Sequence, residues 1–386
     1  MTSTESDLLE PARQPLADAG TAFDLRPTDE QRMLVDTVRE FALRACRPAA
    51  LAADATCRTP PELLGTAAEI GLGALGVPEA LGGFLDHRST VTGVLAAEAL
   101  AEGDMGIALA CLSSGAVATA LGLWGDPTQQ ATHLAAFADA APPVAALAVA
   151  EPQVLFDPFA LRTRARRVAG GDLLLHGSKA LVPRGVDADL LVVAAMLDET
   201  PSLFLVEPAG ARGLTVAAEP AMGVRAAATA RLEFEDMPLP AGALLAQGDP
   251  QVYREMVALA RIGWSALALG TAQAVLAYVS TYVNERTAFG EPISNRQSVA
   301  FAVADIAIEL ESLRLSTYRA ARLAETGGDF IRAASLTRAL AARHAMAIGS
   351  AGVQLLGGHG YTKEHPVERW YRDLRAAGML EGGLIL

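Results

Sequence analysis

The spacing of hydrophobic positions divides the chain into two helical parts separated by a part built of short apolar runs. Helical spacing begins after Thr28 and continues to about residue 138. Between residues 144 and 245 the pattern changes to short β-type runs that alternate with Gly, Pro and Asp. Long helical patterns then return, the clearest at 297–325 and 330–356. The pattern therefore predicts helices, then strands, then a bundle of long helices.

The predicted fold class is a multidomain protein with helical outer domains and a central β-barrel or sandwich-like domain. The expected β-type runs are 144–149, 173–175, 190–193, 203–206 and 229–234. The expected divisions are a disordered tail over 1–23, an N-terminal helical domain over 24–140, a central β domain over 141–247 and a C-terminal four-helix-bundle domain over 248–386. Arg162, Arg164 and Arg166 alternate along one further run and would share one strand face. That face is interpreted as solvated, with binding of anionic phosphates as the alternative.

Composition narrows the class of protein. Hydrophobic residues make up 51% of the chain, and the formal net charge is −13, which disfavours nucleic acid or an anionic membrane as a partner. No uncharged apolar run is expected to reach transmembrane length, and residues 1–20 show no signal peptide. The three cysteines are too few for a disulfide framework or a metal site. The expectation is a cytoplasmic protein without membrane or nucleic-acid partners.

Two glycine- or histidine-containing motifs have simpler interpretations than ligand binding. Gly71 to Gly76 fits the pattern G-x-G-x-x-G, but helical spacing precedes it and Pro78 follows, so a helix-end turn is predicted. His359 and His365 lie six positions apart with no third ligand at a sensible spacing, so no metal is expected.

Two blocks near the C-terminal part of the chain carry candidate chemistry. The loop that contains Gly357 and Gly358 exposes backbone N–H groups, and Glu381 follows in an apolar run, which provides an anion cradle and a carboxylate base. Arg286 offers a forked donor for a pyrophosphate, and Phe289 offers an aromatic face for an adenine. From the residues alone, Glu381 is more readily interpreted as part of a frayed C-terminal tail, and the second block as a capped helix end.

The order and spacing of these blocks resemble the acyl-CoA dehydrogenase family. Glu381 stands nine residues after Arg372 of the Arg372-Asp373 pair, as the family's catalytic base does. The resemblance implies that FAD is the cofactor and that residues of both blocks contact the FAD of a neighbouring subunit. The implied FAD contacts are Arg286, Phe289, Gln297, Gln354, Gly357 and Gly358. Arg261 lies at a position in the family's active-site region and is the implied substrate-binding residue.

The implied reaction is α,β-desaturation of an acyl-CoA thioester, in which the base takes the α-proton and FAD takes the β-hydride. The implied assembly is a homo- or hetero-oligomer, a dimer of dimers with a related dehydrogenase chain, and the implied electron acceptor is an electron-transfer flavoprotein. The chain departs from the family where a subunit holds its own flavin. Residues 150–157 lack the family's glycines and hydroxyls, Leu181 replaces the ring-stacking Trp, and Pro183 replaces a Thr that bonds the flavin.

These losses fall on one half of the site only. We therefore hypothesise a hetero-oligomer in which this chain completes the FAD site of a different, complete subunit. The alternatives are a non-catalytic scaffold subunit, and an acyl-carrier-protein dehydrogenase or an oxidase on the same fold.

Overall fold

The computed structural model describes residues 26–83 and 88–386, so the predicted disordered tail over 1–23 lies outside the described residues. The N-terminal part consists of helices. They are α1 (Asp29–Phe41), which continues through a π-helical turn (Ala42–Cys46) into α2 (Arg47–Thr56), then α3 (Pro61–Glu69), α4 (Thr90–Ala101), α5 (Met105–Trp124) and α6 (Pro127–His133). Thr28 caps α1 in a capping box with Gln31, where the sequence predicts the first helix to begin. Gly71, at a φ of 87°, opens the predicted helix-end turn after α3.

The central part is one curled sheet. Its strands are β1 (Ala145–Ala148), β2 (Arg164–Arg167), β3 (Leu173–Val182), β4 (Leu190–Leu197), β5 (Thr200–Val206), β6 (Leu214–Ala218) and β7 (Ala230–Leu239). The strand order is β1-β4-β2-β3-β7-β6, and β5 pairs with β4. β4 pairs in parallel with β1 and β2, and the remaining pairs are antiparallel. The sheet encloses its own apolar cluster, separate from the larger core of the helices.

Five of these strands overlap the five predicted runs, whereas β6 was not predicted. It pairs only with β7 at the edge of the sheet and is largely exposed, so its sequence lacks a strong apolar signal. On β2, Arg164 and Arg166 form surface ion pairs with Glu199 and Asp236. The predicted interpretation of this face as solvated is therefore confirmed.

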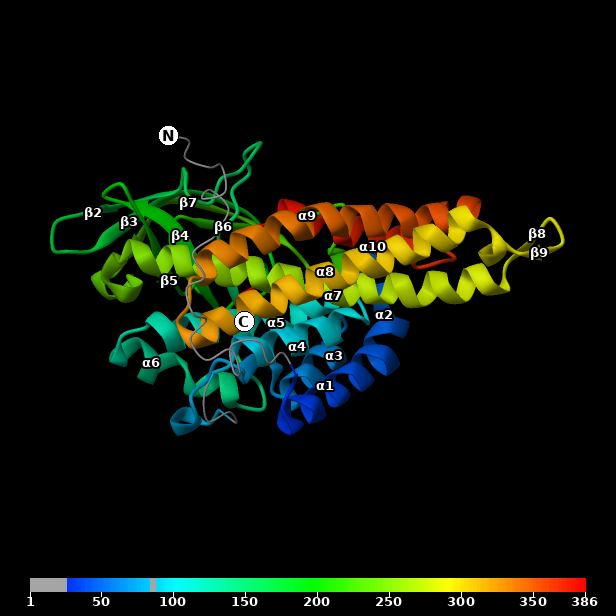
Figure 1. The fold of residues 1–386 in the computed structure, drawn as a ribbon. Helices are drawn as coiled ribbons and strands as arrows, with labels where there is room; N and C mark the ends of the chain where they lie inside the picture. Colours follow the sequence, from blue (N-terminus) through cyan, green and yellow to red (C-terminus); the bar gives the residue numbers. More distant parts are fainter. Residues whose placement is uncertain (1–25, 84–87) are drawn as a thin grey trace, which may run out of the picture.

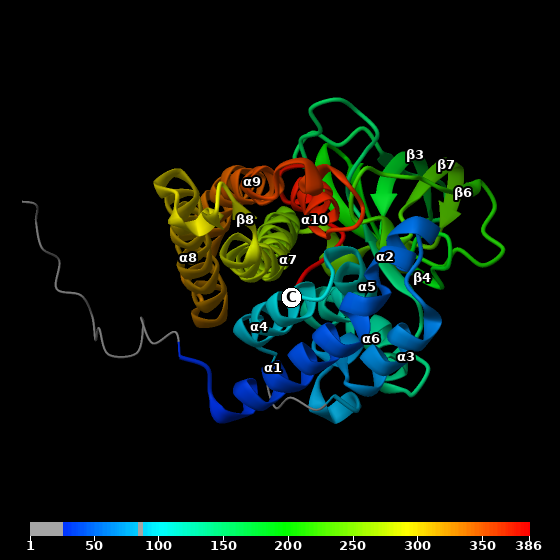
Figure 2. The same cartoon turned by 90° about the vertical axis from the view of Figure 1, so that its right-hand side faces the viewer.

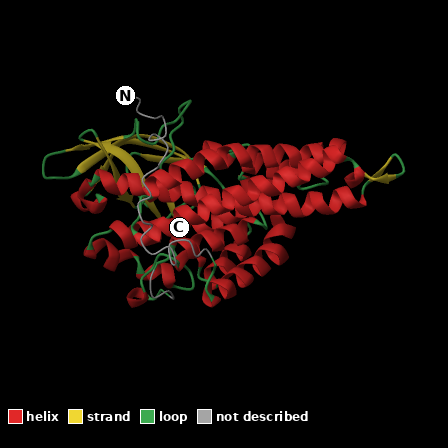
Figure 3. Ribbon diagram, in the orientation of Figure 1, coloured by secondary structure: helices red, strands yellow, loops and turns green. Residues whose placement is uncertain are grey.

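Long helices form the C-terminal part. α7 (Pro250–Glu285), α8 (Gln297–Thr326) and α9 (Phe330–Leu355) run side by side, and the short helices α10 (Val367–Leu374) and α11 (Ala376–Met379) follow. The hairpin of β8 (Thr287–Ala288) and β9 (Glu291–Pro292) projects from one end of the bundle, opposite the curled sheet (Figure 1). Viewed along the bundle, α10 lies between α9 and the sheet (Figure 2). Apart from this hairpin, all strands belong to the central domain (Figure 3).

The Arg372-Asp373 pair on α10 joins the three parts of the chain. Both terminal nitrogens of Arg372 contact Asp54 at 2.9 and 3.0 Å. Asp373 accepts the backbone N–H of Val224 at 2.6 Å, and burial together with the nearby Asp104 raises the pKa of Asp373. This pair is thus a structural connection between α10, α2 and the β domain.

One composition-based expectation is wrong. α5 is an uncharged helix of 20 residues, long and apolar enough to cross a membrane, and part of α7 also passes that test. Most of both helices is buried inside the protein, which is typical of core helices. They are therefore weak evidence for a membrane span.

Candidate functional site

Glu381 lies at the junction of α7, α9 and the β domain, where two arginines contact its carboxylate. Arg261 on α7 donates from Nε to both carboxylate oxygens, at 3.3 and 3.2 Å, and from Nη2 to Oε1 at 3.1 Å. The Nε of Arg338 on α9 lies 3.5 Å from Oε1. All three side chains are mostly buried. The carboxylate therefore has a charged partner on two sides, and the alternative interpretation of Glu381 as part of a frayed tail is wrong.

Arg261 was predicted to bind substrate, but its nitrogens are already engaged. Beyond Glu381, its Nη1 donates to Ser335 at 3.2 Å, and the ring of Phe159 lies 5.9 Å from its guanidinium carbon. The substrate role of Arg261 stays a prediction. In this conformation the side chain is a partner of Glu381.

Arg338 was not singled out from the sequence. Its Nη2 donates to the backbone oxygen of Leu380 at 2.9 Å, whereas its buried Nη1 has no hydrogen-bond partner among residues 26–83 and 88–386. Burial lowers the pKa of Arg338, and the charge of Glu381 opposes that shift. Nothing in the sequence pointed to the pair of Arg338 and Glu381, because α9 and the C-terminal residues around Glu381 meet only through tertiary packing.

Residues 382–386, called the strap below, continue from Glu381 into the middle of the molecule. In Figures 1 and 2 the C label lies beside α4, α5 and α7. The side chains of Leu384, Ile385 and Leu386 are 0%, 1% and 7% exposed. The cavity that remains beside Glu381 has a volume of about 10 Å³ and is lined by Leu181, Trp264 and neighbouring residues. Ligand pockets for drug-sized molecules measure about 300–1,000 Å³.

The two elements that depart from the family pattern are joined by a buried ion pair. Lys179 Nζ lies 2.9 Å from Glu151 Oε1, and both side chains are almost completely buried. Lys179 also donates to the Val149 oxygen, and Glu151 accepts the backbone N–H groups of Arg162 and Thr163. Glu151 and Lys179 therefore satisfy each other's charge inside the β domain. Their burial is explained by these contacts without a bound flavin.

Replacing Lys179 by Met is expected to lower the free energy of unfolding by about 3–5 kcal/mol, because Glu151 would stay buried without its partner. Urea unfolding followed by far-ultraviolet circular dichroism measures this change. The double variant Lys179→Met with Glu151→Gln is the control and should recover part of the loss. A cost below about 1 kcal/mol, the range of exposed pairs, would contradict the structural role.

The same lysine should give stability a pH dependence. Burial lowers the pKa of Lys179 from 10.5 to about 8, and Glu151 partly opposes that shift. Between these values the unfolded chain binds more protons than the folded chain, so the contribution of Lys179 to the free energy of unfolding rises with pH. The difference in stability between the wild type and Lys179→Met should therefore grow from pH 8 to pH 10. A difference that stays constant or shrinks over this range would exclude the shifted pKa.

All six predicted FAD contacts lie together at the hairpin end of the bundle. Arg286 caps the C-terminal end of α7, Gln297 begins α8, and Gln354 lies near the end of α9 before the Gly357–Tyr361 turn. α7 and α9 both end here while α8 begins here, because the three helices run antiparallel in turn (Figure 1). The six residues are Arg286, Phe289, Gln297, Gln354, Gly357 and Gly358, and all are exposed.

The hairpin presents Phe289 at its tip. Phe289 and Gly290 both have positive φ, 56° and 85°, as a tight two-residue hairpin turn requires. The Phe289 side chain is 94% exposed, and the guanidinium carbon of Arg296 lies 5.6 Å from its ring centroid. No side-chain partner of Arg286 is found in the described part of the chain. An exposed aromatic ring and an exposed forked donor thus lie together at this end.

The predicted base and the predicted FAD contacts are far apart. Arg261 and Arg286 lie on or at the end of one continuous helix, α7, and 25 residues at 1.5 Å per residue place them about 37 Å apart. The structure therefore does not bring Glu381 and the hairpin end into one site within a chain.

Three potential metal ligands meet near the hairpin end. His359, Glu364 and His365 place their ligand atoms within 4.8 Å of one another, so the expectation that no third ligand stands near the two histidines is wrong. The Tyr278 hydroxyl lies 2.6 Å from Nδ1 of His365. The expectation of no metal stays a prediction.

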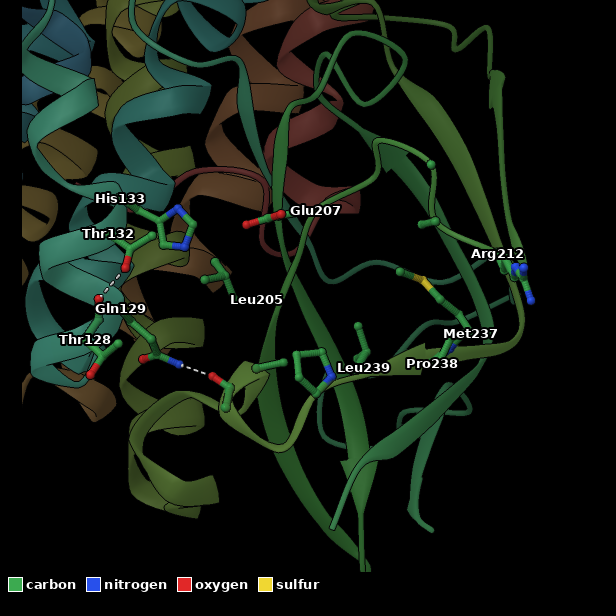
Figure 4. Close-up of a pocket in the computed structure, with 15 residues that line it drawn as sticks. Thr128, Gln129, Thr132, His133, Leu205, Glu207, Arg212, Met237, Pro238 and Leu239 are labelled. Atoms are coloured by element: carbon green, nitrogen blue, oxygen red, sulfur yellow. Dashed lines mark hydrogen bonds between the residues drawn. The ribbon is translucent and has the colours of Figure 1, made fainter. Parts of the chain in front are cut away.

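A large concavity lies away from Glu381 and was not foreseen. It has a volume of about 540 Å³ and separates α6 from the edge of the β domain (Figure 4). His133 and Glu207 face each other across it, while Arg212 points away. Its lining is mainly apolar and it brings together no set of reacting groups.

Comparison with known proteins identifies the family. The chain matches the N-terminal domain of acyl-CoA dehydrogenases over residues 28–141, the middle domain over 146–237 and the C-terminal domain over 251–383. It belongs to the acyl-CoA dehydrogenase family, whose members are FAD-dependent oxidoreductases.

Individual relatives cover nearly the whole chain. The short-chain specific acyl-CoA dehydrogenase of Bos taurus mitochondria is 35% identical over 373 residues, covering 92% of this chain and 87% of the relative. Butyryl-CoA dehydrogenase from Megasphaera elsdenii superimposes with a TM-score of 0.85 at 28% identity, covering 92% and 95% of the two chains. A structure titled as the electron transferring flavoprotein of Acidaminococcus fermentans gives a TM-score of 0.85 at 32% identity, covering 93% and 96%. The predicted fold class, two helical domains around a central β domain, is confirmed.

The residues at each end of the bundle show whether this chain could hold the FAD that the family uses. Beside Glu381 the residues do not fit a flavin ring, because Gly382 packs against Val149, Gly383 lies against Pro183, and only about 10 Å³ is left. At the hairpin end the exposed Arg286, Phe289 and glycine turn offer donors and an aromatic face, and the contact that Phe289 makes there is with the exposed Arg296. The hairpin end of the bundle is therefore suited to contact FAD, whereas the region beside Glu381 is not.

Proposed function

We propose that this chain is a subunit of a hetero-oligomeric acyl-CoA dehydrogenase and completes the FAD site of a related, complete chain. The observation that carries the proposal is the contrast between the two ends of the bundle. The hairpin end keeps its predicted FAD contacts exposed, whereas the end at Glu381 is filled by the strap.

The surface of α8 supports an oligomer. Phe301, Ile308 and Leu315 are spaced by seven residues along one face of α8, and each is more than half exposed. An apolar stripe of this kind on a long helix is typical of a protein–protein interface. It continues from the hairpin end, so a partner that packs on α8 would also meet Arg286 and Phe289.

When bound in the assembled enzyme, FAD would supply the hydride acceptor for α,β-desaturation of the acyl group. This chain would contribute binding: Arg286 pairs with a pyrophosphate, Phe289 covers an aromatic ring, and the N–H groups of Gly357 and Gly358 bind anionic oxygens. The names of the relatives support an acyl-CoA thioester with a short acyl group as substrate. The electron transferring flavoprotein title supports a carrier of that kind as electron acceptor.

The test is the flavin content of the purified chain alone and after co-expression with other acyl-CoA dehydrogenase chains of the same organism. Visible absorbance should show little FAD in the chain alone and bound FAD in one co-purified pair. Stoichiometric FAD in the chain alone would defeat the proposal. Peroxide formation by the complex would instead indicate an oxidase on the same fold.

A further inference from the structure

The strap is held by hydrogen bonds from side chains of the helical domains to its backbone. The indole Nε1 of Trp264 donates to the backbone oxygen of Gly382 at 2.7 Å, and Arg88 donates to the backbone oxygen of Leu386. Gly382 and Gly383 adopt positive φ, 71° and 76°, which turns the chain inward directly after Glu381. The strap is therefore a folded element with its own hydrogen bonds.

The surrounding helices are shaped to receive it. A Cβ placed on Gly263 of α7 would lie 3.2 Å from the side chain of Leu384. A Cβ placed on Gly93 of α4 would lie 2.8 Å from the Cβ of Leu386. These two glycines let the strap approach both helices closely, so larger residues at either position would displace it.

We propose that the strap is a built-in occupant of this chain's own acyl and flavin site, and that it keeps Glu381 in an ion-pair cluster with Arg261 and Arg338. The side chains of Leu384, Ile385 and Leu386 take the apolar volume that an acyl chain would need. The strap also leaves no room for a planar ring beside Leu181 and Pro183. This inference concerns the chain's own site and does not depend on a partner subunit.

The test shortens the strap side chains and asks whether a site appears. The variant Leu384→Ala/Ile385→Ala/Leu386→Ala keeps the backbone bonds of the strap but frees more apolar volume than a butyryl chain fills. The matched control is Ile306→Ala/Leu310→Ala/Leu313→Ala, which removes the same side-chain types from an equally buried part of α8. Both are made in a Trp124→Phe/Trp370→Phe background, so that Trp264 is the single tryptophan.

Two measurements decide the outcome. Acrylamide quenching of Trp264 fluorescence should rise in the strap variant only. Calorimetry with butyryl-CoA should show binding at least about tenfold tighter in the strap variant than in the unshortened chain or the control. A folded strap variant that lacks either effect overturns the proposal, as does an unshortened chain that binds butyryl-CoA equally well. If the triple variant does not fold, Leu384→Ala with Leu313→Ala as its control replaces it, with the same criteria.

Discussion

In the assembled hetero-oligomer, replacing Arg286 by Ala should weaken FAD binding about 10- to 100-fold, the cost of losing a charge-assisted bond to a phosphate. Arg286 is exposed, and no acidic side chain competes for it in the part of the chain that the structure describes. Its removal therefore leaves no buried charge in the isolated chain, and the fold should be unaffected. The measurement is the dissociation constant of FAD, obtained by dialysis followed by flavin fluorescence.

The matched control is Arg212→Ala, which removes an exposed arginine from the β domain. The β domain lies at the opposite end of the molecule from the hairpin (Figure 1). It should leave FAD binding unchanged. An Arg286→Ala complex that retains wild-type affinity for FAD would show that this chain does not reach the partner's cofactor.

The second expected result concerns Glu381. In the assembled complex, Glu381→Gln should keep turnover within about twofold of the wild type, whereas loss of a working general base costs about 10²- to 10⁴-fold. The reason is geometric, since both carboxylate oxygens of Glu381 are engaged by Arg261 and the strap leaves no room for a substrate α-carbon. Dye reduction per bound FAD with butyryl-CoA measures the rate.

Glutamine is the suitable replacement because its amide oxygen can still accept from Arg261. The urea midpoint of each complex is determined in parallel, so that unfolding is not mistaken for loss of chemistry. A fall of 10²-fold or more in a folded complex would return Glu381 to the role of catalytic base that the family resemblance implies.

Periodicity and turn residues were sufficient to predict the architecture. Thr28 and Gln31 form the first cap and Gly327 ends α8, because such local signals act within a few residues of themselves. The edge strand β6 was not predicted, because the prediction depends on local signals and none of the apolar positions of this strand is buried. The predicted FAD contacts gathered at one end because the three long helices run antiparallel, which their length and short connections already indicate.

The environment of Glu381 could not be predicted from the sequence. Arg338 precedes Glu381 by 43 positions, and only the packing of the tail against α9 brings the two together. The apolar run Leu384-Ile385-Leu386 was visible, but hydrophobicity alone does not say which cavity a segment fills. Likewise, the burial of Glu151 and Lys179 against each other results from the three-dimensional fold, since 28 positions separate them in the sequence.

The span of α7 has a thermodynamic consequence. Perturbations at the hairpin and perturbations around the strap share no contacts across about 37 Å, so their free energies should simply add in a double-mutant cycle. Selection can therefore act on the two ends of this helix separately. A gene copy that loses catalytic ability at one end can remain indispensable for what it supplies at the other.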